Sequence, residues 1–139
     1  MSSEVTLVRD VMTHEVATLD RNDRLSTADN VMRLGRIRHM PVMEDGDLVG
    51  LVTQRDLFRG ALLKALGYGL KAEQTMLDTL AVKEVMATDL ETIAPDATLQ
   101  EAARIMVERK IGCLPVVEDA KLVGILTEGD FVVLVAGSR

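Results

Sequence analysis

An internal repeat constrains this chain more than any other feature of its sequence. When the chain is shifted by 74 residues (86 − 12), residues 8–56 align with residues 82–130 without a gap, and 17 of the 49 aligned positions are identical. A repeat of this length predicts two similar half-domains with two related sites. Each half, at about 60 residues, is marginally stable alone, so we expect the halves to share their stability. The identical positions form blocks: Val11-Met12 on Val85-Met86, Pro41-Val42 on Pro115-Val116, Glu44-Asp45 on Glu118-Asp119, and Leu48-Val49-Gly50 on Leu122-Val123-Gly124.

The composition is that of an ordinary globular protein, and it argues against several functions. Apolar residues make up 47% and charged residues 27% of the chain. The net charge of −6 argues against binding to a nucleic-acid backbone. Aromatic residues, at 2%, are too few to form stacking platforms for single-stranded bases. Cys113 has no second cysteine to pair with, and residues 1–4 lack the features of a signal peptide, so we expect a cytoplasmic protein without membrane contact.

Each repeat shows the same succession of patterns, which predicts the order β-α-β-β-α after a short helical turn. The turns are expected at Val8–Met12 and Val82–Met86, and the first strands at Glu15–Leu19 and Asp89–Ile93. A two-stranded hairpin follows in each repeat, the first one around an Asp-Gly turn. The hairpin strands are expected at His39–Met43 and Leu48–Val52, and at Cys113–Val117 and Leu122–Leu126.

The helices are recognised by their caps and by their apolar spacing. Thr98 and Glu101 form a capping-box pattern, Asp23 is a looser cap in the first repeat, and Gly35 is expected to end the helix there. Apolar residues three and four positions apart predict the buried faces. These residues are Leu25, Ala28, Val31 and Met32; Leu99, Ala102, Ala103, Ile105 and Met106; and Phe58, Ala61, Leu62, Ala65 and Leu66.

The last segment is the ambiguous one. Phe131–Ala136 is rich in β-branched residues and would fit a strand, but the repeat symmetry favours a helix. A helix that is apolar all round needs cover, so we expect this one to meet a partner subunit. We therefore predict an α/β (α+β) fold with a first repeat at 1–69, a helical tether at 70–79 and a second repeat at 80–139.

The motif Gly-x-x-Thr-x-x-Asp occurs in both repeats directly after a predicted strand, as Gly50, Thr53 and Asp56 in the first. Thr and Asp at this spacing fit a helix capping box, which is a structural role. A helix start that follows a glycine also favours anions, and a carboxylate there can accept the two hydroxyls of a ribose. The two roles are compatible, and both are retained. The second copy is Gly124, Thr127 and Asp130.

These elements together resemble the CBS domain family, in the tandem arrangement called a Bateman module. The resemblance rests on Val-Met before each first strand, on Ile-x-x-x-Pro-Val from Ile37 and from Ile111, on the hairpins and on the two Gly-x-x-Thr-x-x-Asp motifs. It covers about residues 5–136. It implies two CBS repeats packed through their sheets with pseudo-two-fold symmetry.

The resemblance also implies a ligand. Modules of the family that this chain resembles bind AMP, ADP, ATP or other adenosyl compounds in the cleft between repeats. It implies that Asp56 and Asp130 hold the ribose and that the motif threonines contact ribose or phosphate. Residues near Thr18 and Thr92 are implied to surround the adenine. The ligand-binding residues implied in this way are Thr18, Arg38, His39, Met40, Pro41, Gly50, Thr53, Arg55, Asp56, Thr92, Cys113, Leu114, Pro115, Gly124, Thr127 and Asp130.

The two implied sites differ in charge. Arg38 and His39 occupy positions where nucleotide-regulated members of the family carry phosphate-binding basic residues, whereas the second repeat has Gly112 and Cys113 there. Arg55, opposite Gly129, adds a further basic residue to the first repeat only. We expect one site suited to charged phosphates and a second that is weaker, empty or suited to a less anionic ligand.

Three functions compete for such a chain. The first is a regulatory module that senses AMP, ADP or ATP, or alternatively S-adenosylmethionine or NAD, and passes its state to a separate partner protein. The second is an enzyme, against which the sequence shows no nucleophile with a base and no paired catalytic carboxylates. The third is a ligand-free dimerisation scaffold in which Thr53 and Asp56 are only caps. We expect the first, as a homodimer that needs no cofactor and has no metal site.

Overall fold

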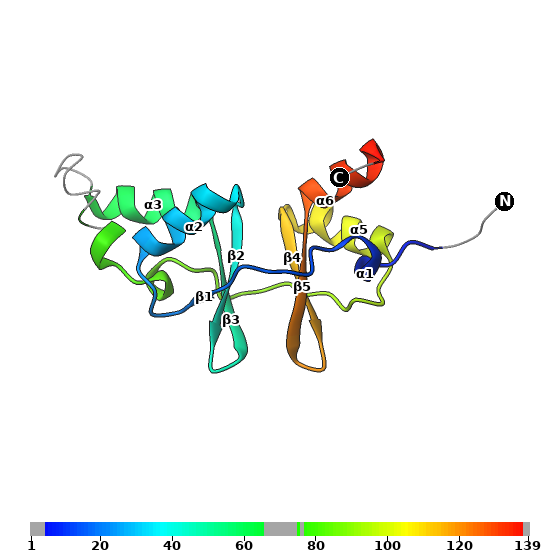
Figure 1. The fold of residues 1–139 in the computed structure, drawn as a ribbon, viewed down its shortest axis with the longest axis horizontal. Coiled ribbons are helices and arrows are strands. Elements are labelled where there is room, and N and C mark those ends of the chain that lie inside the picture. Colours follow the sequence, from blue (N-terminus) through cyan, green and yellow to red (C-terminus); the bar gives the residue numbers. More distant parts are fainter. Residues whose placement is uncertain (1–4, 66–74, 76, 138–139) are drawn as a thin grey trace. The chain divides into compact units, whose positions relative to one another are not determined.

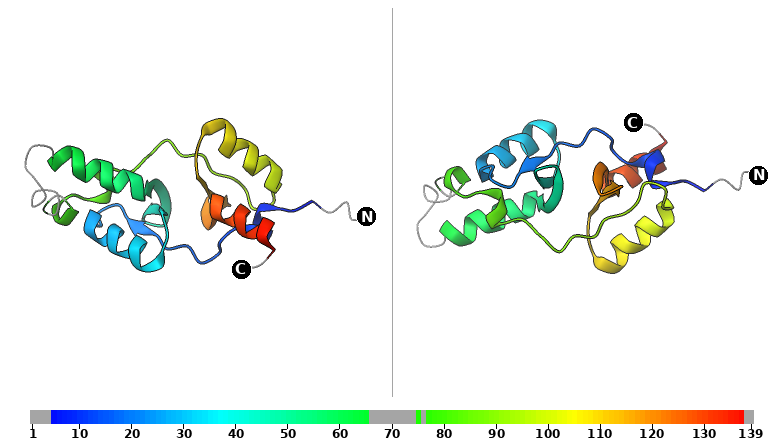
Figure 2. Two further views of the ribbon diagram at one scale, coloured as in Figure 1. Left: turned by 90° about the horizontal axis from the view of Figure 1, so that it is seen from above. Right: turned by 90° about the horizontal axis from the view of Figure 1, so that it is seen from below.

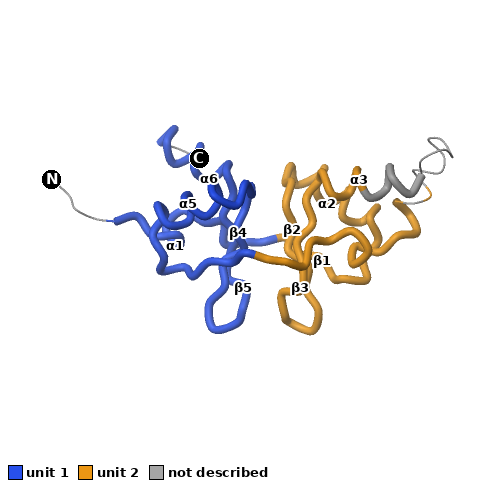
Figure 3. Tube along the Cα trace, turned by 180° about the vertical axis from the view of Figure 1, so that it is seen from behind, with its two compact units in different colours: residues 1–16, 91–139 blue, residues 17–90 orange. Residues whose placement is uncertain are grey.

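The chain forms two compact units, each assembled around its own sheet (Figures 1 and 3). The computed structural model describes residues 5–65, 75 and 77–137. One unit comprises residues 17–90, and the other joins residues 1–16 to residues 91–139. The helical tether expected at 70–79 lies mostly outside the described residues.

The unit of residues 17–90 has a three-stranded sheet in the order β1-β2-β3. β1 runs parallel to β2, which pairs antiparallel with β3. Helices α2 and α3 pack against each other and against β2 and β3 respectively (Figure 2). The elements are β1 (Leu19–Asp20), α2 (Leu25–Gly35), β2 (His39–Glu44), β3 (Asp47–Thr53), α3 (Gln54–Ala65) and the 3-10 helix η1 (Val82–Glu84).

The second unit repeats this plan with small changes. β4 and β5 form an antiparallel hairpin, and a single parallel bridge from Ile93 to Val116 takes the place that β1 has in the other unit. The short helix α1 packs against α5, α6 and β5. The elements are α1 (Val8–Val11), α5 (Leu99–Arg109), β4 (Cys113–Glu118), β5 (Lys121–Thr127) and α6 (Glu128–Ala136).

The short turns that open the two repeats are exchanged. The backbone of Ala87 makes two hydrogen bonds with Leu51 of β3, at 3.0 and 2.9 Å. In the same way, Thr13 makes two with Ile125 of β5, at 2.9 and 3.0 Å. The turn of the first repeat thus completes the unit of the second repeat, and the turn of the second repeat completes the unit of the first.

This exchange explains the glycine of each motif. A Cβ atom on Gly50 would lie 2.4 Å from the sulfur of Met86, and one on Gly124 would lie 2.6 Å from the sulfur of Met12. The methionine side chains could move, but the backbone oxygens of Ala87 and Thr13 would lie 3.1 and 2.9 Å from these Cβ atoms. Packing is therefore a sufficient reason for a glycine at Gly124, where the contact with the backbone oxygen is closer than real Cβ atoms allow, and it favours a glycine at Gly50.

The hairpins follow the predicted pattern. Asp45 and Gly46 have φ values of 50° and 86°, and Asp119 and Ala120 have values of 53° and 65°. Positive φ at both central residues is the signature of the two-residue turn that suits a twisted hairpin. Ala120 is under steric strain in this conformation, because its Cβ disfavours the left-handed region.

Each unit has its own apolar core, and the predicted helix faces contribute to both. Met32 and Met106 are buried core residues, as their helical spacing predicts, and Met12 is buried in the same core as Met106. Helix α6 confirms the choice of helix over strand for the last segment. The side chains that are buried on the predicted faces of α2 and α5 are Leu25, Ala28 and Met32, and Leu99, Ala102 and Met106.

Three local predictions are wrong. Asp23 does not cap α2: the N-cap is Arg24, and the Asp23 carboxylate instead accepts the backbone N–H of Asp20 at 2.8 Å. The first strands are shorter than predicted, because only Leu19–Asp20 and the single residue Ile93 reach a neighbouring strand. Phe58 is 55% exposed, and the neighbouring Leu57, at 2%, faces the core.

Candidate functional site

The candidate site in the first repeat is built at the start of α3, where β3 ends. The backbone N–H of Thr53 donates to Oδ2 of Asp56 at 3.1 Å, and the backbone N–H of Asp56 donates to Oγ1 of Thr53 at 3.1 Å. This is a reciprocal capping box, so the structural role predicted for the pair is confirmed. Both side chains are only half-buried, which leaves them accessible to a solute.

The second repeat places Thr127 and Asp130 at the start of α6, where the Thr127 hydroxyl donates to Oδ2 of Asp130 at 3.4 Å. The backbone N–H of Thr127 donates to Oδ2 of Asp130 at 2.9 Å. The other carboxylate oxygen, Oδ1, accepts the hydroxyl of Thr13 at 3.2 Å. Asp130 is 4% exposed, so this carboxylate is much less accessible than that of Asp56.

Backbone pairing brings the residues before each Pro-Val to the same helix starts. The N–H of Gln54 donates to the carbonyl of Arg38 at 2.8 Å, and His39 lies opposite Thr53 in the β2–β3 register. Side chains directly opposite each other on paired strands are close neighbours. The first repeat therefore gathers Arg38, His39, Thr53 and Asp56 around one helix N-terminus.

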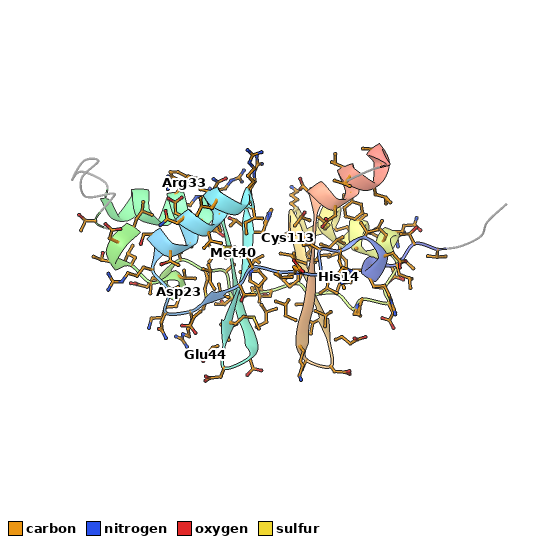
Figure 4. The ribbon with its side chains drawn as sticks, viewed as in Figure 1. His14, Asp23, Arg33, Met40, Glu44 and Cys113 are labelled. Carbon is orange, nitrogen blue, oxygen red and sulfur yellow. The ribbon has the colours of Figure 1, made fainter. Side chains whose placement is uncertain are left out.

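The corresponding positions of the second repeat are less basic. The N–H of Glu128 donates to the carbonyl of Gly112 at 3.1 Å, and Cys113 lies opposite Thr127. Cys113 is 3% exposed, and it is shown at the start of β4 in Figure 4. A glycine, a buried thiol and an acidic residue thus stand where the first repeat has two basic side chains and Gln54.

The exposed arginines of the first repeat reinforce this difference. Arg38 and Arg55 are both exposed, and Arg55 lies in the first turn of α3 beside Asp56. Gly129 occupies the matching position in α6. A helix N-terminus with nearby guanidinium groups is a favourable environment for a phosphate. Within the described residues, the first repeat provides this combination and the matching positions of the second do not.

Four of the predicted ligand-binding residues are buried, and two of them, Met40 and Leu114, belong to the cores. Met40 and Leu114 are fully buried, and Pro41 and Pro115 are buried beside them. Met40 is labelled on β2 in Figure 4. The side chains of Met40 and Leu114 pack in the cores, so these two residues could reach a ligand only through the backbone.

The two threonines predicted near the adenine lie at the first strands. Thr18 immediately precedes β1, and Thr92 precedes Ile93, whose N–H donates to the carbonyl of Pro115 at 3.1 Å. Both threonines are exposed. Each adjoins a residue that pairs with the Pro-Val strand, Leu19 with Val42 and Ile93 with Val116.

Metal-binding and membrane-spanning features are absent from the described part of the chain. It contains no group of three His, Cys, Asp or Glu side chains arranged to hold a metal ion. No helix among the described residues has the length and apolar character needed to cross a bilayer.

The sequence reasoning missed Thr13. Its signal is present in the repeat alignment, because Thr13 falls on Ala87 and the two differ by a hydroxyl. Nothing in the sequence, however, indicates that this hydroxyl reaches a carboxylate 117 positions away. Only the exchange of turns between the repeats brings Thr13 to Asp130.

Comparisons with known proteins agree with this architecture. CBS domain-containing protein YhcV of Bacillus subtilis is 33% identical over 126 residues, which cover 91% of this chain and 83% of that protein. The CBS domain pair of protein MJ0100, solved with 5′-methylthioadenosine and S-adenosyl-L-methionine, has a TM-score of 0.78 at 27% identity, with 98% and 100% of the two chains covered. CBSX2, solved with AMP, has a TM-score of 0.75 at 27% identity, with 94% and 96% covered.

The sequence model of the CBS domain family matches this chain twice, at residues 8–62 and at residues 82–137. These two segments contain the motif, the hairpin and the exchanged turn of each repeat, and together they make up most of the chain. The protein belongs to the CBS domain family, as a tandem pair.

Proposed function

We propose that this chain is a regulatory module that binds an adenine nucleotide and passes the binding state to a partner protein. The observation that carries the proposal is the arrangement at the start of α3. There, the accessible carboxylate of Asp56 lies on a helix N-terminus, backbone pairing brings Arg38 and His39 to the same helix start, and Arg55 precedes Asp56 in the first turn. This provides an acceptor for ribose hydroxyls together with basic groups for phosphates.

Two relatives of known structure support the class of ligand. The MJ0100 pair was solved with two adenosyl compounds, and CBSX2 was solved with AMP. The basic groups of the first repeat favour AMP, ADP or ATP there, because each phosphate carries negative charge. The module then acts by binding its ligand more tightly in one conformation than in another, since a ligand shifts an equilibrium only by that difference.

A second type of ligand is favoured by the second repeat. Its motif carboxylate has no Arg or His at the positions that match Arg38, His39 and Arg55, and Glu128 begins α6. An adenosyl compound without phosphates, such as S-adenosylmethionine with its cationic sulfonium, suits this environment better than ATP does. The chain would then be able to distinguish two adenosyl ligands with its two repeats.

We also expect the chain to act as a homodimer. Helix α6 carries three exposed apolar side chains, Val132 at 67%, Leu134 at 45% and Val135 at 87%. Burial of such a face in a second subunit would remove apolar surface from water. Light scattering is expected to give about twice the 15.2 kDa mass of one chain, and a single-chain mass at micromolar concentration would contradict the dimer.

A thermal-shift screen tests the proposed function. The purified chain is heated with AMP, ADP, ATP, S-adenosylmethionine or NAD, and with GMP and CMP as controls for the base. A ligand present at 100 times its Kd adds about 2.7 kcal/mol of stability, which raises the melting temperature clearly. A shift with adenosyl ligands, absent with GMP and CMP, supports the proposal. No shift with any of them at millimolar concentration favours the ligand-free scaffold, in which Thr53 and Asp56 serve only as caps.

A further inference from the structure

The carboxylates of the two motifs differ in how fully their oxygens are engaged. In the second repeat, Oδ2 of Asp130 accepts the backbone N–H of Thr127 at 2.9 Å, and Oδ1 accepts the hydroxyl of Thr13 at 3.2 Å. In the first repeat, Oδ2 of Asp56 accepts the N–H of Thr53 at 3.1 Å. Within the described residues, Oδ1 of Asp56 has no hydrogen-bond partner.

A sequence difference accounts for the engagement of Oδ1. Ala87 occupies the position that matches Thr13, and both residues form the same pair of backbone hydrogen bonds with the second hairpin strand of their unit. The carbonyl oxygens of Ala87 and Thr13 also lie at similar distances, 3.1 and 2.9 Å, from a Cβ built on Gly50 and on Gly124. The backbones are therefore equivalent, and only the hydroxyl distinguishes them.

The two carboxylates also differ in burial, and the one with more hydrogen bonds is the more buried. Asp130 is 4% exposed, whereas Asp56 is half-buried and open to a solute. A ribose presents two neighbouring hydroxyls, and both must find acceptor positions on the carboxylate. At Asp130 such a ligand meets an oxygen that already accepts the Thr13 hydroxyl, so binding must displace or share that bond.

We propose that Thr13 is a specificity-determining residue, which lowers the affinity of the second repeat for a ribose diol by occupying Oδ1 of Asp130. Ala87 leaves the matching oxygen of Asp56 open, so the first repeat is the stronger ribose site. This inference rests on the proposed function, because it assumes that the motif carboxylates receive a ribose. It adds to that function a residue outside the motif, which determines which of the two sites binds a ribose more tightly.

The test is a calorimetric titration of the full chain with AMP. The Asp56→Asn background isolates the second repeat, and the Asp130→Asn background isolates the first. In the Asp56→Asn background, Thr13→Val removes the hydroxyl while keeping the shape, and it is expected to tighten AMP binding about tenfold, in keeping with the strength of a hydrogen bond to a charged group. Thr13→Ser keeps the hydroxyl and is expected to retain the weaker affinity.

The reciprocal change is made in the first repeat. In the Asp130→Asn background, Ala87→Thr supplies the missing hydroxyl and is expected to weaken AMP binding about tenfold by the same reasoning. Ala87→Val adds the same bulk without a hydroxyl and is the matched control, expected to bind as the background does. Thermal melts of each variant establish that it is folded at the temperature of the titration.

The outcomes separate this inference from the proposed function. Opposite shifts with Thr13→Val and Ala87→Thr support it, as does AMP binding that appears only when Thr13 is replaced. Unchanged affinity in both variants overturns the role of Thr13 while leaving the nucleotide module intact. Equal weakening by Ala87→Val and Ala87→Thr also overturns it, because bulk rather than the hydroxyl is then responsible. No binding by any variant or by the wild type overturns both proposals.

Discussion

Asp56 and Asp130 stabilise the helices that they begin, whether or not a ligand is bound. Each accepts the backbone N–H of the threonine three residues earlier, and a carboxylate at a helix N-terminus also interacts favourably with the helix dipole. A structural role alone does not explain the basic residues Arg38, His39 and Arg55 of the first repeat, whose counterparts in the second are Gly112, Cys113 and Gly129. The two copies share the hydrogen bond from the threonine N–H to the carboxylate, but the threonine hydroxyl accepts the N–H of Asp56 in the first copy and donates to the carboxylate of Asp130 in the second.

Arg38 should contribute to recognition of phosphate rather than of the nucleoside. We predict that Arg38→Ala weakens AMP binding several-fold, because a charge-assisted contact is lost, while adenosine binding changes little. Calorimetry at low and high salt measures this, and the difference between variant and wild type should shrink as salt screens the contact. Arg33→Ala, which removes an ion pair with Asp29 on α2, is the control. An equal loss of adenosine binding would show that Arg38 has a different role.

Gly124 should be intolerant of a side chain. We predict that Gly124→Ala destabilises the protein by about 1–3 kcal/mol, because the added Cβ would lie 2.9 Å from the backbone oxygen of Thr13 and 2.6 Å from the Met12 sulfur. Chemical denaturation measures the effect. The control is Gly35→Ala, where a Cβ would meet only atoms at 3.7 Å or beyond. Equal stability of the two variants would contradict the close approach at Gly124.

Among the elements, the two hairpins have the same turn conformation but form it with different residues. Both turns need positive φ at two positions, and the first meets this need with Gly46 while the second uses Ala120. Asp45 and Asp119 tolerate this conformation better than most residues do. The second turn is therefore the more strained of the two.

Ala120 offers a simple route to a more stable protein. We predict that Ala120→Gly stabilises the chain by about 1 kcal/mol, because glycine adopts φ near 65° without the steric cost that alanine has there. Gly46→Ala is the reciprocal change and should destabilise the chain by a similar amount. Urea denaturation of both variants provides the comparison. If Ala120→Gly proves destabilising, the strain assigned to this turn is absent.

The sequence correctly predicts the elements that are determined by neighbouring residues or by the internal repeat. The hairpins follow from short apolar runs around turn residues, and helix α6 follows from the repeat despite its β-branched composition. The cap at Thr98 is confirmed by its hydrogen bond from the N–H of Glu101 at 3.0 Å. The prediction for Asp23 fails because a carboxylate before a helix can equally serve a preceding turn, here through the N–H of Asp20.

Features that depend on distant partners cannot be predicted in this way. The burial of Leu57 in place of Phe58 depends on where α3 begins and how it packs, which a stripe of apolar residues does not fix. The fully buried Met40 and Leu114 are expected from the sequence to line a ligand site, but their side chains face the cores. The contact between Thr13 and Asp130 depends on the exchange of turns, for which no local pattern exists.

For the whole molecule, that exchange decides which pieces of the chain are structurally complete. The turn at 82–87 supplies the fully buried Val82 and pairs its backbone with β3, so the first repeat lacks part of its unit if it ends at residue 69. The same holds for the second repeat without residues 8–13. Folding of either repeat therefore requires a segment that the sequence assigns to the other.

A fragment experiment tests this directly. We predict that residues 17–90 form a folded unit and that residues 1–69 do not. The shorter fragment lacks the turn at 82–87, and the additional residues 1–16 cannot replace it. Circular dichroism melts and the dispersion of amide signals in NMR spectra measure the difference. A cooperative melt for residues 1–69 that matches that of residues 17–90 would contradict the importance of the exchanged turn.

The measurement that tests the central claim most directly is a calorimetric titration of the wild-type chain and of Asp56→Asn with AMP. The amide introduced by this substitution keeps a carbonyl oxygen that can accept the N–H of Thr53, so the helix cap and the fold should survive. We predict saturable binding to the wild type and a loss of about tenfold or more in affinity for the variant, because hydrogen bonds to a charged acceptor are replaced by weaker ones. Equal affinities for AMP, or no binding to the wild type at millimolar concentration, would contradict the proposed nucleotide site.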